Sequence, residues 1–176
     1  MIALLALALA QEPGNPDLKW IKEQGFSIMK PPKNEEWGFR DKAFYADSKA
    51  VVGHKVDTLT IEVLSFNVQN WDAKKQAEAE LAKFTGNAKL TITNKKDLFQ
   101  SKLPGGAASG ARAWAFEVDY KPEGGVASEA RLWTFPGREN QNGFIVLMVG
   151  DAGMYKKHQK AADYILSSIK TWKIPK

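Results

Sequence analysis

The sequence predicts a mixed α/β domain in which helices cover both faces of an antiparallel sheet, an α/β/α sandwich. Two neighbouring segments of the second half alternate apolar and polar residues, and a third follows after a polar turn, as in an antiparallel meander. The third segment, Phe144 to Val149, is apolar on both faces. A strand of that kind needs cover on both sides, which predicts helices above and below the sheet.

The first ten residues, Met1 to Ala10, carry no charged side chain and end in Ala8-Leu9-Ala10. A small-x-small ending before polar Gln11 is typical of a signal-peptidase site. At about 15 Å as a helix, the segment is too short to span a bilayer. We therefore expect residues 1–10 to be an export signal cleaved near Ala10/Gln11, giving a periplasmic or secreted protein. No basic residue precedes the apolar run, so we expect the natural signal to begin further upstream.

The composition is that of one soluble domain without cysteine chemistry. The 176 residues are 44% hydrophobic and 26% charged, and none is cysteine. This excludes disulfides, cysteine nucleophiles and iron–sulfur clusters. It also excludes lipid anchoring through a cysteine after the signal, because Gln11 stands there. The net charge of +5 comes from basic residues spread along the chain, which favours solvated surfaces over a nucleic-acid site.

The first elements are short. Residues 11–25 are predicted to form an irregular leader with one or two helical turns, and residues 26–176 to form the single domain. Phe26 to Lys30 alternates like a strand, which Pro31-Pro32 stops. Trp37 to Arg40 is a second extended candidate.

The middle of the chain predicts a strand, a helix and a strand. Thr58 to Val68 is the longest strand signal, and its apolar residues change phase midway, which predicts either a bulge or burial on both sides. Asp72 is placed to cap a helix that runs to about Phe84 and ends at Gly86. Leu90 to Asn94 is a further short strand.

The second half predicts the meander and a final helix. Ala111 to Tyr120 and Ala130 to Phe135 precede the apolar strand already described. Asp151 is a candidate cap for a helix from about Ala152 to Ile169. Thr171 to Ile174 then closes the chain in extended form.

This order of elements resembles the PsbP/DcrB-like family. The resemblance rests on Phe26-Ser27-Ile28 running into a Pro-Pro stop and Trp37, on the capped mid-chain helix, and on a turn near Gly143 before a long amphipathic helix. That helix ends in Tyr164-Ile-Leu-Ser-Ser-Ile-Lys-Thr-Trp172. The resemblance covers about residues 18–176.

The resemblance implies a PsbP-like α/β/α sandwich that is exported or lumenal and docks onto a larger assembly. It supplies no family-wide catalytic motif, so no residue role is carried over. Many bacterial members are lipoproteins, and Gln11 departs from that pattern.

The two histidines, His54 and His158, are the candidates for metal or acid–base chemistry. Asp57 follows His54 by three residues, the spacing of a partial pair. A metal site needs three or four ligands, and no second histidine is near in sequence. We therefore expect His54 to lie at a strand edge or loop beside a solvated neighbour, and His158 to be a helix-boundary residue bonded locally. No metal and no cofactor are predicted.

Recognisable catalytic motifs are absent from the sequence. Gly105 to Arg112 has the glycine spacing of a phosphate loop, but Ala111 stands at the lysine position and a strand follows instead of a helix. Neither a Gly-x-Ser-x-Gly elbow nor a His-Glu-x-x-His motif occurs. The expectation is a protein that is not an enzyme.

The remaining candidates are aromatic and basic. Six tryptophans are many for this length, and most are expected in the core. An exposed Trp–Arg patch can bind a sugar ring or a protein. The candidate residues are Trp37, Arg131, Trp133 and Arg138.

Three functions remain open. The leading hypothesis is an exported, soluble, non-catalytic docking domain for an envelope or extracellular protein partner. The alternative is a small-molecule or carbohydrate binder with a tryptophan-lined cleft, which requires two of Trp37, Trp71 and Trp133 to be exposed and adjacent. The third is a hydrolase whose carboxylates face each other in a pocket.

Overall fold

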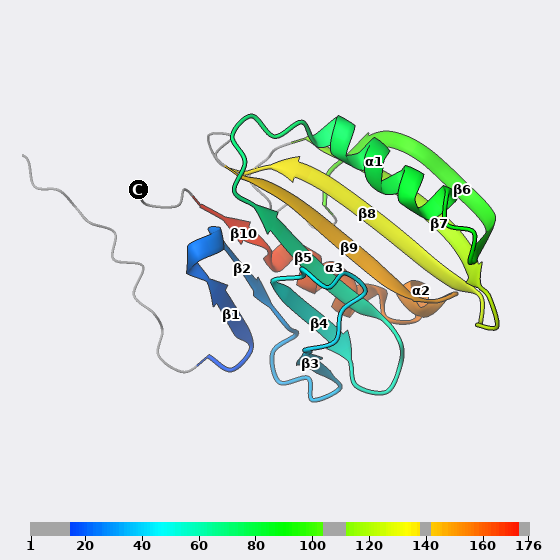
Figure 1. The fold of residues 1–176 in the computed structure, drawn as a ribbon. Helices are drawn as coiled ribbons and strands as arrows, with labels where there is room; N and C mark the ends of the chain where they lie inside the picture. Colours follow the sequence, from blue (N-terminus) through cyan, green and yellow to red (C-terminus); the bar gives the residue numbers. More distant parts are fainter. Residues whose placement is uncertain (1–14, 104–111, 138–141, 173–176) are drawn as a thin grey trace, which may run out of the picture.

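The computed structural model describes residues 15–103, 112–137 and 142–172. These residues form two antiparallel sheets with helices on both sides (Figure 1). The large sheet has the strand order β3-β4-β5-β9-β8-β7-β6, and the small sheet has the order β1-β2-β10. The predicted signal, residues 1–10, lies outside the described residues, as does most of the glycine-rich segment after Leu103.

The described elements have the following bounds. The strands are β1 (Leu18–Ile21), β2 (Phe26–Met29), β3 (Trp37–Phe39), β4 (Ala50–His54), β5 (Thr60–Phe66), β6 (Leu90–Ser101), β7 (Ala113–Pro122), β8 (Ser128–Pro136), β9 (Gly143–Asp151) and β10 (Lys170–Thr171). The helices are the 3-10 turn η1 (Lys22–Gln24), α1 (Ala73–Thr85), α2 (Met154–Lys157) and α3 (Gln159–Ser168).

Helix α1 covers one face of the large sheet. It lies across β6, β7 and β8 in Figure 1 and buries Leu81 and Phe84 against Phe116 and Leu132. As predicted, Asp72 caps this helix, because its side chain accepts the backbone N–H of Lys75 at 3.0 Å.

The other face is covered by α3 and the small sheet. Ala162, Ile165 and Leu166 of α3 belong to the same buried cluster as Phe26 of β2 and Ile61 of β5. Helices on opposite faces of an antiparallel sheet make this an α/β/α sandwich, as predicted.

The apolar pattern of β5 changes phase midway, for which the sequence left two explanations, a bulge or burial on both sides. Its pairing with β9 runs without a register shift from Thr60 to Phe66, so the strand has no bulge there. Val63 points into the cluster under α3, whereas Leu64 points into the cluster under α1. The strand is therefore buried on both sides.

The helical turns predicted within residues 11–25 are reduced to the single 3-10 turn η1, Lys22–Gln24. Leu18–Ile21 is a strand that pairs antiparallel with Phe26–Met29, and a single 3-10 turn joins the two. Gly25 ends that turn at φ 68°, a left-handed conformation that glycine adopts without strain. Pairing with a neighbouring strand outweighs the weak helical preference of so short a segment.

The last helix was predicted to be continuous and is broken. Gly153, at φ 86°, begins the short helix α2, and His158 separates it from α3. Asp151 belongs to β9 and does not cap either helix. The break is important for the candidate site because it places His158 at a bend, where the side chain can reach another element.

The described residues include no helix long and apolar enough to cross a membrane.

Candidate functional site

The candidate site begins at the turn between β4 and β5. His54 is the last residue of β4, and its Nδ1 accepts the backbone N–H of Asp57 at 2.9 Å. Because Nδ1 is an acceptor, the proton of the neutral ring lies on Nε2. His54 lies at the end of its strand, beside the β4–β5 turn, and its side chain is buried, with 5% exposed.

The same turn is fixed to the end of β9. Thr58 Oγ1 accepts the backbone N–H of Asp151 at 2.8 Å. The chain leaves β9 here, turns at Gly153 and enters α2, so the break at His158 comes to lie beside the β4–β5 turn. The pairing of β5 with β9 thereby brings together two segments that are distant in sequence.

Two positively polarised groups converge on one oxygen of Asp57. His158 Nε2 lies 2.6 Å from Asp57 Oδ2, and Lys157 Nζ donates to the same oxygen at 2.8 Å. These hydrogen bonds, that of Lys157 first, lower the pKa of Asp57 from 3.8 to about 2. Asp57 is therefore ionised across the physiological pH range.

The two imidazoles pack on each other and on Trp37. The His54 and His158 ring centroids are 4.3 Å apart, and the Trp37 ring meets both edge-to-face, at 5.4 Å and 5.7 Å. Trp37 is the cross-strand partner of His54 in the β3–β4 pair. The indole thus packs against both histidines and restrains their rings.

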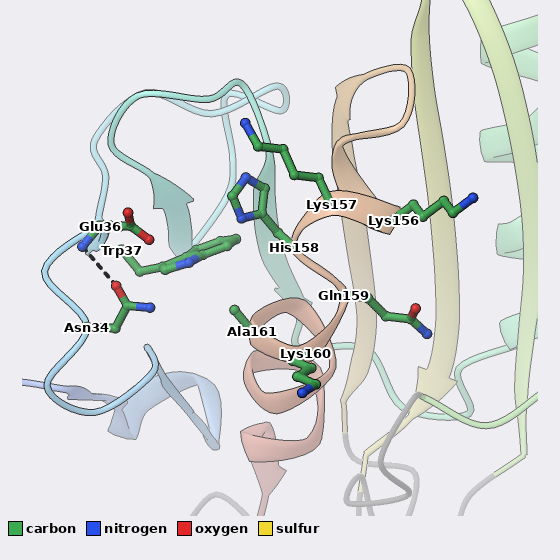
Figure 2. Close-up of a pocket in the computed structure, with 9 residues that line it drawn as sticks. All are labelled: Asn34, Glu36, Trp37, Lys156, Lys157, His158, Gln159, Lys160 and Ala161. Carbon is green, nitrogen blue, oxygen red and sulfur yellow. Dashed lines mark hydrogen bonds between the residues drawn. The ribbon is translucent and has the colours of Figure 1, made fainter.

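A pocket of about 390 Å³ opens beside this cluster. Figure 2 shows Asn34, Glu36 and Trp37 facing the turn that carries Lys156 to Ala161. Asn34 Oδ1 accepts the backbone N–H of Glu36 at 2.9 Å, which orders that wall.

The lining of the pocket is basic. Three lysines and His158 stand against one carboxylate, that of Glu36; the lysines are Lys156, Lys157 and Lys160. The first turn of α3 also faces the pocket, and no side chain caps it. The unpaired N–H groups of a helix N-terminus favour negative charge, so the pocket is suited to an acidic group.

The predicted site residues do not come together. Trp37 contributes to the pocket wall, but three strands separate β3 from β8, which carries Arg131 and Trp133. The Arg131 guanidinium lies 4.1 Å from the centre of the Tyr155 ring. Arg138 lies outside the described residues.

The tryptophan-lined cleft is not formed as the alternative hypothesis required. Trp37 is 1% exposed and Trp133 is 6% exposed, so neither offers a free face to a sugar. Ala115, the cross-strand partner of Trp133, leaves room for that indole on the same face of the sheet. The pocket also carries a single carboxylate, which does not provide the facing pair expected of a hydrolase.

The sequence analysis paired His54 with Asp57 but did not place His158 beside them. The His54–Asp57 spacing was recognised, but His158 was predicted to bond locally, and its partner Asp57 is 101 residues away. The missing signal was the pairing of β5 with β9, which places the start of one strand beside the end of the other.

No protein-family model matches the chain, and no curated protein sequence matches it. Solved structures do match. Cyanobacterial PsbP from Synechocystis is similar with a TM-score of 0.55 and 10% identity, over 94% of this chain and 99% of that one. LpqN of Mycobacterium tuberculosis, involved in cell envelope biogenesis, has a TM-score of 0.55 and 13% identity, over 83% of this chain and 84% of that one.

A structure from Bacteroides thetaiotaomicron is similar with a TM-score of 0.56 and 13% identity. The match covers 91% of this chain and 50% of the Bacteroides chain, so the protein spans half the length of that relative. At these identities the comparisons establish the fold, which is PsbP-like.

Proposed function

We propose that this protein is an exported, soluble, non-catalytic domain that docks an acidic segment of an envelope or extracellular protein partner. The observation that carries the proposal is the basic pocket beside α3, in which three lysines and His158 oppose the single carboxylate of Glu36. The N-terminal segment of residues 1–10, typical of an export signal, supports the location. The PsbP-like fold supports it further, since LpqN is involved in cell envelope biogenesis.

The charges of the pocket suit recognition of a flexible acidic segment. Lys156 and Lys160 are exposed and flank His158 in the chain, so their ammonium groups are open to a carboxylate that approaches from solvent. Lys157 also lines the pocket, but Asp57 holds its ammonium in an ion pair, so Lys156 and Lys160 remain to meet an acidic group. Such surface charges act mainly on the association rate and are weakened by salt.

The test is affinity capture from the envelope fraction of the native cell with the mature domain as bait. A second bait carries Lys156→Glu and Lys160→Glu, which invert the charge of the pocket. A matched control carries Lys75→Glu and Lys89→Glu, two exposed lysines at the α1 side of the sheet. We expect a partner that the wild type and the control capture, that the pocket variant loses, and that 0.5 M salt releases.

Capture of the same partner by the pocket variant would contradict docking at this pocket. An envelope fraction that yields no partner above background would contradict the docking function as a whole.

A second candidate function is binding of a small anionic molecule, and the size of the pocket favours it. A volume of about 390 Å³ lies in the range of small-molecule sites. Equilibrium dialysis against a panel of phosphorylated and carboxylated metabolites separates the two candidates. A ligand from the panel that prevents capture of the protein partner would favour the small molecule.

A further inference from the structure

We propose that His54, Asp57 and His158 form a binding site for a divalent transition metal, with Zn²⁺ as the best fit. The ligand atoms are Nδ1 of His54, Oδ2 of Asp57 and Nε2 of His158. This site goes beyond docking at the basic pocket and does not depend on it.

The distances suit a tetrahedral ion. One ligand atom from each of the three residues lies within 4.8 Å of the other two. His158 Nε2 is 2.6 Å from Asp57 Oδ2, and His54 Nδ1 is 3.8 Å from the same oxygen. Ligand bonds of about 2.0–2.1 Å in a tetrahedron place neighbouring ligand atoms roughly 3.3 Å apart. The first distance must lengthen and the second must shorten, each by well under 1 Å.

The tautomer of His54 is already the one that the site needs. Nδ1 presents its lone pair toward the turn, where it now accepts the backbone N–H of Asp57. The ion replaces that contact. The proton lies on Nε2, which is buried and has no hydrogen-bond partner among the described residues. A buried N–H group without an acceptor is rare in proteins. A metal bound at Nδ1 would explain it, because the second N–H of a ligating histidine then donates to a nearby carboxylate.

Glu36 is the outer-shell partner for that proton. Its Oε2 lies 3.7 Å from His54 Nε2, and the side chain is 70% exposed and free to move closer. A ligating histidine commonly donates its second N–H to a carboxylate, which fixes the ring and raises its basicity. Closing this contact on metal binding would satisfy the unpaired N–H group.

Lys157 contacts one of the proposed ligand atoms, Asp57 Oδ2, in the metal-free cluster. Its ammonium and the His158 N–H both contact Asp57 Oδ2, so this oxygen is already ionised and surrounded by positive charge. The Lys157 side chain is 57% exposed and can swing into solvent when the ion arrives. To bind the ion, His158 must present Nε2 without a proton, so the ring binds as the neutral tautomer that carries its proton on Nδ1.

The donor set selects the ion. Two imidazoles and one carboxylate suit Zn²⁺ and its neighbours in the first transition row, whereas Ca²⁺ and Mg²⁺ prefer oxygen ligands. Three protein ligands leave a fourth position, and His158 borders the pocket, from which water reaches the ion. Trp37, packed edge-on against both rings, keeps the ligands in place.

The test is calorimetric titration of tag-free protein with ZnCl₂, checked by metal content after gel filtration. We expect one Zn²⁺ per chain and no binding of Mg²⁺. Asp57→Asn and His158→Gln should each weaken binding at least about 100-fold, and Glu36→Gln about 10-fold. Asp97→Asn removes the same charge from an exposed ion pair and serves as the matched control.

Lys157→Met separates metal binding from a purely structural ion pair. If Asp57 is a ligand, removing its competing ammonium should tighten Zn²⁺ binding several-fold, while Lys75→Met leaves it unchanged. Circular dichroism of each variant verifies that it is folded. The proposal is overturned if wild type takes up no stoichiometric Zn²⁺, or if Asp57→Asn and Lys157→Met both bind it as wild type does.

Discussion

His158 Nε2 lies 2.6 Å from Asp57 Oδ2, although the two residues are 101 positions apart in the chain. The contact joins the β4–β5 turn to the break between α2 and α3. Lys157 donates to the same oxygen, so one carboxylate receives both. This clamp holds one end of the large sheet to the helix that covers its face, and it borders the basic pocket.

The first prediction concerns the pH dependence of stability at Asp57. Its pKa is lowered from 3.8 to about 2 in the folded protein, chiefly by the Lys157 hydrogen bond. The unfolded chain therefore takes up the proton first as the pH falls, which favours unfolding. The stabilisation is complete above about pH 5 and is lost as the pH falls toward about 2.

Urea denaturation at a series of pH values measures this effect. The difference in midpoint between wild type and Asp57→Asn should be largest at neutral pH and shrink through this window. Asp97→Asn, at an exposed ion pair, should show a small difference throughout. If the difference in midpoint between wild type and Asp57→Asn stays constant with pH, the lowered pKa of Asp57 does not contribute to stability.

The second prediction concerns Glu62, which is fully buried in β5. Its carboxylate accepts the backbone N–H groups of Phe44 and Tyr45, at 2.6 Å and 3.2 Å, and the Ser48 hydroxyl at 2.8 Å. Glu62→Ala leaves these donors without an acceptor and should lower the free energy of unfolding by about 3 kcal/mol. Glu78→Ala, at an exposed site on α1, should change it by less than about 0.5 kcal/mol. Equal losses in urea unfolding would show that Glu62 does not secure this loop.

The third prediction concerns the contact between Gly143 and Trp71. A Cβ built on Gly143 would lie 1.8 Å from the Trp71 ring, which stacks on Phe66. Gly143→Ala must displace the indole and should cost about 2 kcal/mol, with a change in near-ultraviolet circular dichroism. Gly38→Ala is the control, since its nearest neighbour is Lys55 at 3.9 Å.

A double-mutant cycle verifies the cause of that loss. In a Trp71→Ala background, Gly143→Ala should be much less costly because the clashing ring is gone. If the losses of stability from the two substitutions add, the cost of Gly143→Ala does not come from a clash with Trp71.

The fourth prediction concerns the cap of α1. Asp72→Ala removes the acceptor for the Lys75 N–H and should lower the free energy of unfolding by about 1 kcal/mol, or Tm by about 3 °C. Calorimetry of Asp47→Ala, an exposed loop aspartate, provides the comparison. Identical Tm values for the two variants would exclude a capping contribution.

Most of the fold could be predicted because its signals are local. Capping by Asp72, the alternation of β7 and β8, and burial of β9 on both faces each depend on residues within one element. The predictions failed where pairing with another strand determined the secondary structure. Leu18–Ile21 became a strand by pairing with β2, and Leu90 to Asn94 proved to be the start of the longer β6, which pairs with β7.

The order of elements was enough to predict the α/β/α sandwich, because periodicity and composition are properties of the chain itself. The export signal at residues 1–10 stays a prediction. The cluster of His54, Asp57 and His158 was not accessible in this way. It exists because β5 pairs with β9 and the final helix breaks at His158. Strand order and helix breaks depend on packing between distant segments, so the chemistry of this site arose only when the sheet was assembled.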